Sequence, residues 1–345
     1  MIREDPMTSL TIGLDTAKSV FHAVEKNANG GTLKKAKLTR SKLLSYFEQK
    51  PACTIAIEAC GACHHWHRVF SKMGHSVVII APQYVAKHRV GNKNDFNDAN
   101  ALAEVVQKED VRTVPPKSIE QQDVQLIHRI RERLIKQRTA LSNQIRGFLA
   151  EYGIILPKGI RYIRQELPFI LENSENELTS LARTQFHFLY EELKVLDEKI
   201  KSVDKEINTL SEANEQCKRL QTMPGIGPIV STALWVALGD SKNFKNGRHF
   251  AAWCGLVPKQ YTTGDNPRLL GISKRGNAYL RTQLINGARS ALRHANTKED
   301  SVSQWVVKLE ERVGFNKACV ALANKMARMV WAMVHHLTVY KVKEV

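Results

Sequence analysis

The sequence predicts three parts in order: an α/β sheet domain over residues 9–114, a helical middle over 117–212, and a mainly α-helical C-terminal domain over 213–345. Three observations support this division. Short β-type runs alternate with helical stretches up to residue 114. A basic amphipathic pattern and then a heptad pattern fill the middle. Glycine turns separated by helical stretches make up the last part.

The first part has the strand order of a known sheet type. β-like runs lie near residues 9–14, 19–26, 32–38, 53–58 and 76–81, and helical stretches lie near 41–49 and 62–73. The Asn- and Gly-rich stretch at 27–31 is typical of a hairpin turn. Three strands in a meander, followed by helix, strand, helix and strand, is the order of a ribonuclease H-like (RuvC-like) sheet.

Four carboxylates stand out in this part. Asp15 and Glu58 each end an apolar strand run, and Asp95 and Asp98 lie on one face at the start of a helical pattern. Singly, such residues are more often turn or cap residues. Together they would repel one another unless a cation neutralised them, and oxygen ligands favour Mg²⁺ or Mn²⁺. The set therefore predicts a site for phosphoryl transfer, a reaction catalysed by two metals roughly 3.5–4 Å apart.

The middle part predicts two long helices. The first is strongly basic, and Arg129, Arg133 and Lys136 on it suit contact with a phosphate backbone. The second places apolar residues from Ala182 to Leu210 in a 4-3 alternation, which indicates a coiled coil. Spacing does not decide whether this stripe pairs with the basic helix or with another subunit, and a simple helical spacer is a third interpretation.

The C-terminal part contains a glycine turn that opens onto a helix, at residues 223–228. It is like one half of a helix-hairpin-helix. Exposed amides at Gly225, at Gly227 and at the helix N-terminus can hold a DNA phosphate without reading the base sequence.

Two further glycine turns carry hydroxyl and basic side chains. Thr263 belongs to the first turn, Ser273 to the second, and the surrounding basic residues are Arg268, Lys274 and Arg275. Such turns either bind a phosphate or place a hydroxyl group that attacks one. The residues alone favour phosphate binding.

The amino-acid composition indicates which class of partner the protein binds. The chain has 51 Lys and Arg against 34 Asp and Glu, a formal charge of +17, which favours nucleic acid as a partner. The sequence has neither an apolar run of about 18 residues nor a basic-then-apolar leader, so we expect a cytoplasmic protein without membrane contact.

Cys60 and Cys63 precede three histidines, but a second ligand pair at zinc-finger spacing is missing, so a helix face is favoured over zinc.

Three short stretches carry a resemblance to a known family. Residues 13–18, 57–61 and 92–99 resemble the Asp-Glu-Asp-Asp motifs of transposases of the insertion-sequence 110 family. Residues 223–293 resemble that family's second conserved domain, especially in its 1111 subgroup. The resemblance covers nearly the whole chain.

The resemblance implies a DNA recombinase with a RuvC-type domain and a C-terminal domain that supplies a hydroxyl nucleophile. Asp15, Glu58, Asp95 and Asp98 would be catalytic and hold Mg²⁺ or Mn²⁺. The partners would be element DNA, target DNA and a structured guide RNA, the bridge RNA. The protein would act as a homo-oligomer, either a dimer or a tetramer.

The sequence departs from the family at the nucleophile. The family's serine lies just before a glycine, where this chain has Thr262, Thr263 and Gly264. Thr263 aligns best, Thr262 is one position away and Ser273 is a further candidate; alternatively, this copy is impaired. A junction-resolving RuvC-like nuclease that uses water is the enzymatic alternative. A coiled-coil scaffold without Mg²⁺ dependence is the non-enzymatic one.

Overall fold

The computed structural model describes residues 10–108, 111, 113–263 and 266–342. The chain divides into two compact units, Met1–Ser118 and Ile119–Val345. Among the described residues, no helix is both long and apolar enough to cross a membrane.

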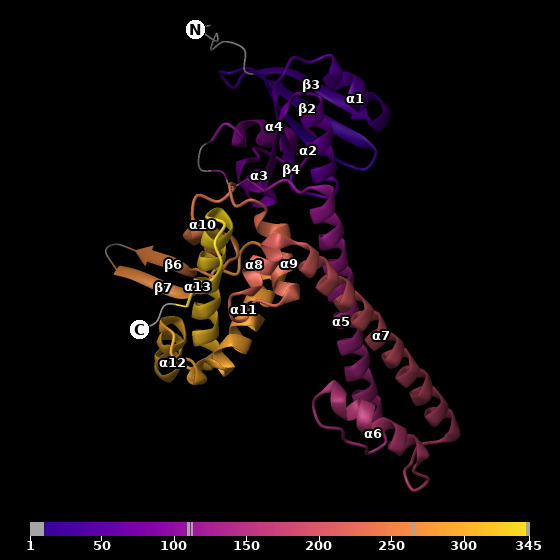
Figure 1. Cartoon of the computed structure of the whole chain (residues 1–345). Helices are drawn as coiled ribbons and strands as arrows, with labels where there is room; N and C mark the ends of the chain where they lie inside the picture. Colours follow the sequence, from indigo (N-terminus) through magenta and orange to yellow (C-terminus); the bar gives the residue numbers. More distant parts are fainter. Residues whose placement is uncertain (1–9, 109–110, 112, 264–265, 343–345) are drawn as a thin grey trace. The chain divides into compact units, whose positions relative to one another are not determined.

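The first unit is built on a five-stranded sheet in the order β3-β2-β1-β4-β5 (Figure 1). β1 (Thr11–Thr16), β2 (Val20–Lys26) and β3 (Thr32–Thr39) form an antiparallel meander. β4 (Thr54–Glu58) and β5 (Ser76–Ile80) extend it in parallel from β1. The succession of strands and helices along the chain is the one that the sequence predicts, and the sheet is compatible with a RuvC-like layout.

Helices pack on both faces of this sheet. α1 (Arg40–Glu48) and α2 (Cys63–Lys72) bury Phe47 and Phe70 against one face, in a core with Ile55 and Ile57 of β4. α3 (Pro82–His88) and α4 (Asp95–Val105) pack in a second core that contains Ala56. Successive residues of β4 thus point to opposite faces, as the pleat of a strand requires.

One glycine lets α4 lie directly on β1. A Cβ at Gly13 would lie 1.9 Å from the carbonyl oxygen of Ala99 and 2.6 Å from the amide nitrogen of Ala103. Since only a residue without a side chain permits this approach, Gly13 fixes where the middle of α4 crosses β1.

The second unit begins with a helical hairpin (Figure 1). α5 (Ile119–Glu151) and α7 (Ser180–Ala213) pack along each other, and α6 (Ile160–Glu172) contacts both. Leu193, Leu196 and Ile200 of the predicted stripe are buried with residues of α5 in one core. The stripe therefore pairs with the basic helix inside this chain, and pairing with a second subunit stays a prediction. The sequence analysis missed α6.

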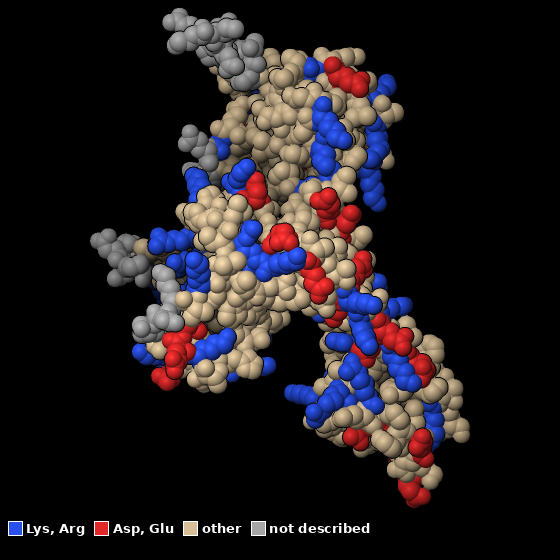
Figure 2. All heavy atoms as spheres, in the orientation of Figure 1, with Lys and Arg blue, Asp and Glu red and all other residues tan. Residues whose placement is uncertain are grey.

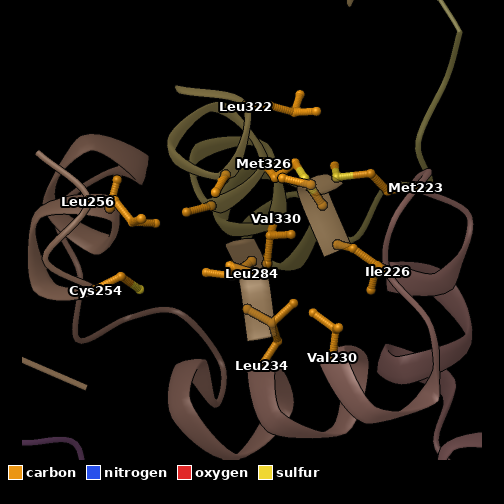
Figure 3. Close-up of a cluster of buried hydrophobic side chains, with 14 of the residues drawn as sticks. Met223, Ile226, Val230, Leu234, Cys254, Leu256, Leu284, Leu322, Met326 and Val330 are labelled. Carbon is orange, nitrogen blue, oxygen red and sulfur yellow. The ribbon is translucent and has the colours of Figure 1, made fainter. Parts of the chain in front are cut away.

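The remaining helices of the second unit form a core separate from that of the hairpin. They are α8 (Glu215–Gln221), α9 (Pro228–Leu238), α10 (Gly247–Trp253), α11 (Ala278–Arg293), η1 (Ala295–Thr297), α12 (Ser301–Val313) and α13 (Phe315–His335). Figure 3 shows Val230 and Leu234 of α9 pointing toward Leu284 of α11 and Val330 of α13. α12 and α13 are separate helices because Gly314 adopts a φ of +81° between them.

Two further features of this unit are a β-hairpin and a buried histidine. β6 (Pro258–Thr263) and β7 (Asn266–Ile272) form an antiparallel hairpin, so the first predicted turn is largely strand. Buried His128 of α5 lies 2.8 Å from the hydroxyl of Tyr279 on α11 and 3.0 Å from that of Thr232 on α9. His128 thereby ties the hairpin to the C-terminal helices.

Candidate functional site

Asp15 lies at the end of β1 beside a histidine of the next strand. The register pairs Asp15 with His22 of β2, and directly opposed residues of an antiparallel pair project to the same face. One ligand atom from each of Asp15, His22 and Asp95 lies within 4.8 Å of the others. The three residues therefore form a compact group of potential metal ligands.

The first turn of α4 supplies two carboxylates. The side chain of Asn94 caps this helix by accepting a 2.8 Å hydrogen bond from the amide of Asn97. Asp95 is 64% exposed and lies 3.3 Å from Nδ1 of His22, whereas Asp98 is 14% exposed and pairs with Arg89 at 2.7 Å. The two carboxylates thus have different partners although they share one helical turn.

Glu58 completes the set from the end of β4, which runs parallel to β1. Burial and then the charges of Asp95, Asp98 and Glu58 together raise the pKa of Asp15 to about 6. The pKa of Glu58 is also raised, by burial and then by Asp98. The fold therefore brings all four predicted carboxylates into mutual electrostatic range, although Glu58 and Asp98 lie outside the compact group of three.

These residues fit a divalent cation. Two of the three donors are carboxylate oxygens, which suit Mg²⁺ or Mn²⁺, and the third is an imidazole nitrogen. After the larger effect of burial, part of the raised pKa of Asp15 comes from repulsion by the neighbouring carboxylates, which a bound cation would relieve. Lys93 and Arg89 offset part of that repulsion at Glu58.

Sequence reasoning missed His22 and Arg89. Only the register of the β1–β2 hairpin places His22 opposite Asp15. Arg89 is the residue that directly follows α3. Asp15 and His22 are equally far from residues 17–20, which separate the innermost pair of the hairpin, and this was the signal available for His22.

The neighbouring cysteines form no comparable ligand group. Cys60 is exposed, with its sulfur 3.0 Å from Oγ1 of Thr16, and Cys63 is buried at the start of α2. His64 contacts the backbone amide of Lys117 at 3.3 Å and its ammonium at 3.1 Å. Within the described ranges, the group around Asp15 is the one cluster of three potential ligands, so the zinc alternative gains no support.

The predicted basic residues of α5 lie on its surface. Arg129 is 57% exposed and Lys136 is 74% exposed, and both pair with Glu132 at 3.0 Å. Arg133 donates to Gln137 at 2.9 Å. Figure 2 shows Lys and Arg side chains in groups over α5, α6 and α7, with Asp and Glu between them.

The two predicted glycines of the 223–228 turn have different surroundings. A Cβ at Gly225 would lie 2.4 Å from the carbonyl oxygen of Gly287, so close helix packing is sufficient reason for a glycine there. Gly227 is exposed, precedes Pro228 at the start of α9 and borders open space. Gly227 is therefore the more accessible candidate for a phosphate contact.

The candidate hydroxyls lie on β6 and in the loop after β7. Thr262 is exposed on β6. The backbone of Thr263 pairs with Asn266, and the side chain of Thr263 lies outside the described part of the structure. Ser273 is half-buried, and its amide donates to the carbonyl of Val257 at 2.8 Å.

The loop after β7 holds its basic residues in a fixed shape. Lys274 adopts a φ of +54° and donates its amide to the carbonyl of Gly255 at 3.1 Å. The guanidinium of Arg281 donates to the carbonyls of Cys254 and Arg275 at 3.1 and 3.2 Å. Lys274 and Arg275 are exposed on this loop, and Arg268 is exposed on β7.

Comparisons with known proteins identify the family. A family model described as "Transposase IS116/IS110/IS902 family" matches residues 217–303, and a second model, described as a transposase, matches residues 12–154. The chain is similar to the transposase for insertion sequence element IS1111A of Coxiella burnetii, with 41% identity over 96% of this chain and 91% of the relative. It is 40% identical to a probable family 20 transposase of Pseudomonas aeruginosa, over 96% of this chain and 98% of that relative. It is 36% identical to the transposase for insertion sequence element IS1328 of Yersinia enterocolitica, over 95% and 98% of the two chains. The chain therefore belongs to the IS116/IS110/IS902 family of transposases.

Proposed function

We propose that this transposase cleaves and exchanges DNA strands with a divalent cation in its first unit and a hydroxyl nucleophile in its second. The convergence of Asp15, Glu58, Asp95 and Asp98 at one edge of the sheet carries the proposal. Such a carboxylate set is the form that protein sites for phosphoryl transfer take. The proposal places the chain in the 1111 subgroup and in the Asp-Glu-Asp-Asp type.

The chain's own residues have separate tasks in this site. Asp15, His22 and Asp95 would hold the cation, Mg²⁺ or Mn²⁺, with Glu58 and Asp98 completing the acidic set. When bound, the cation polarises the scissile phosphate and stabilises the charge that develops on it. Arg89 holds Asp98 in place through their 2.7 Å ion pair.

The proposed strand cleavage uses a hydroxyl of the second unit. The oxygen of Thr263, Thr262 or Ser273 forms a bond to phosphorus while the bond from phosphorus to the leaving strand's oxygen breaks. The attacking hydroxyl gives its proton to solvent, and the leaving oxygen takes one up. Arg268, Lys274 and Arg275 surround these hydroxyls in sequence and suit the phosphate's charge.

The proposed partners are element DNA, target DNA and a bridge RNA that selects the sites, in a cytoplasmic dimer or tetramer. Support comes from the charge of +17 and from the exposed basic side chains of α5. Such contacts bind phosphates without distinguishing base sequence. Base pairing to a guide RNA would supply the specificity that they lack.

A denaturing adduct experiment tests the proposal. The purified protein is incubated with Mg²⁺, its co-expressed RNA and DNA spanning the element's ends, and protein-bound DNA is then mapped by mass spectrometry. We expect an adduct at Thr263, Thr262 or Ser273, no adduct in EDTA, and none with Asp15→Asn although this variant still binds DNA. Thr282→Ala, which removes an exposed hydroxyl of α11, is the matched control and should leave the adduct unchanged.

Two outcomes would contradict the proposal. Cleaved DNA with free ends and no adduct would favour a RuvC-like nuclease that uses water. Equal reaction with and without divalent cation would exclude the carboxylate site as the catalytic centre.

A further inference from the structure

A groove lies where α10 crosses α13, and none of the predicted site residues lines it. A Cβ at Gly247 would lie 2.6 Å from the carbonyl oxygen of Arg328, so the start of α10 rests directly on the backbone of α13. The groove beside this crossing has a volume of about 460 Å³. Its lining residues are Asn246, Gly247, Arg248, Lys325, Arg328, Met329, Trp331 and Ala332.

Three cations line the groove, and no carboxylate does. Arg248 and Arg328 are exposed and Lys325 is half-buried. Within the described ranges, none of the three forms an ion pair with Asp or Glu. The groove therefore carries positive charge that the chain does not balance locally.

The unbalanced positive charge of the groove affects the pKa of Lys325. Its ammonium lies 4.2 Å from the centre of the Trp305 ring, and burial and the charge of Arg328 lower its pKa. The charge of Asp300 acts in the opposite direction, and it is the smallest of these three contributions. A bound anion would relieve the repulsion between Lys325 and Arg328.

The apolar side of the groove is fixed before any ligand binds. The indole nitrogen of Trp331 donates to the carbonyl of Phe244 at 3.2 Å, and its ring stacks on His335 with centres 4.5 Å apart. A preformed site loses less conformational entropy on binding than a flexible one. Guanidinium groups also match the geometry of phosphate oxygens.

We propose that the α10–α13 groove binds the phosphodiester backbone of a nucleic acid strand through Arg248, Lys325 and Arg328. The strand belongs to the element or target DNA or to the guide RNA, which share this chemistry. The identity of these strands rests on the proposed function, whereas the positive charge and the shape of the groove are observed independently of it.

The salt dependence of binding tests the inference. Dissociation constants of the full chain are measured between 50 and 300 mM salt, roughly the range in which phosphate contacts dominate, with labelled element-end duplex and with the co-expressed RNA. The test variant carries Arg248→Ala, Lys325→Ala and Arg328→Ala. The matched control carries Lys308→Ala, Arg312→Ala and Lys317→Ala, three exposed cations of the neighbouring α12 and α13.

We expect the test variant to reduce the magnitude of the negative slope of log K against log salt by about 2–3. Each lost phosphate contact reduces that magnitude by about 0.7–0.9. Affinity near 100 mM salt should fall at least about tenfold, and the control should change neither quantity to this extent. The single variant Arg328→Ala changes one exposed side chain and should lower the slope by about 1. It keeps the test valid where the triple variant is misfolded.

The outcomes separate this inference from the proposed function. A smaller slope with duplex assigns the groove to DNA, and a smaller slope with RNA assigns it to the guide. Unchanged slopes for both ligands, or an equal change in the control, would overturn the inference while leaving the adduct experiment unaffected. Binding needs no strand cleavage, so an inactive carboxylate site would not alter the result.

Discussion

The replacement Asp15→Asn should stabilise the metal-free protein. Burial and three neighbouring carboxylates raise the pKa of Asp15 from 3.8 to about 6. A shift of about 2 units corresponds to roughly 3 kcal/mol, because one unit is worth 1.36 kcal/mol. Asp15 is partly exposed, so solvent screening reduces the expected effect to about 1–2 kcal/mol.

The sign of the effect depends on pH. Below 3.8 Asp15 is protonated in both folded and unfolded chains, so it costs nothing. Between 3.8 and about 6 the unfolded chain loses the proton first, and the stability of the metal-free protein falls as pH rises. Above about 6 the full penalty applies, and the asparagine substitution removes it.

Hydrogen exchange of the peptides that cover β1 and β4 measures this effect in EDTA at pH 5 and pH 8. We expect the variant to be more protected than the wild type by about 1–2 kcal/mol at pH 8 and by less at pH 5. Glu48→Gln on the exposed face of α1 removes one negative charge away from the site and should change neither value. Lower protection in Asp15→Asn than in wild type at pH 8 would refute the idea that like charges strain this site.

Three further predictions concern the fold. Gly13→Ala should destabilise the first unit by about 2–3 kcal/mol in equilibrium unfolding, because its methyl meets the backbone of Ala99, whereas Gly61→Ala enters open space and should be tolerated. His128→Gln should flatten the loss of stability of the second unit between pH 6.5 and 4, because burial lowers the pKa of His128 from 6.5 to about 4 and only the unfolded chain protonates in that range. Parallel melting-temperature curves for wild type and this variant would contradict the assignment. Arg183→Lys should speed hydrogen exchange at residues 170–180 about tenfold, a loss of about 1.4 kcal/mol, because its guanidinium donates to four backbone carbonyls there; unchanged exchange would contradict it.

The sequence was sufficient for the sheet and for the positions of the carboxylates. Asp15 and Glu58 end apolar runs, and the parallel pairing of β1 with β4 brings such ends to the same edge. Short connections, including the turn at 27–31, make β1, β2 and β3 neighbours in the sheet, whereas β4 pairs with β1 and not with β3, which precedes it in sequence. Local patterns therefore predicted what depends on local geometry.

Residues that depend on register or on tertiary packing escaped the sequence analysis. His22 reaches Asp15 only because the β1–β2 register pairs them, and a shift by one residue would turn it to the other face. Gly225 looked like a phosphate-binding glycine, yet the approach of Gly287 is a sufficient packing reason for it. A glycine has the same sequence signature in both roles.

The identity of the nucleophile is a different kind of problem. Thr262, Thr263 and Ser273 lie on a strand end and a loop, where sequence pattern fixes neither the direction of a hydroxyl nor its distance from a phosphate. The rigid loop that follows β7 restricts Ser273 to a half-buried position, whereas Thr262 is exposed. Accessibility therefore favours Thr262 over Ser273 among the described hydroxyls.

The charge distribution links the two units chemically. The first unit gathers carboxylates that repel a phosphate, and their charges add to burial in raising the pKa of Asp15. The second unit presents unbalanced cations on the α10–α13 groove and exposed cations on α5, which attract a phosphate. If both units act on one DNA, binding and cleavage should respond differently to divalent cations. Binding through the second unit should persist in EDTA, whereas the scissile phosphate should approach Asp15 only when a cation screens the carboxylates.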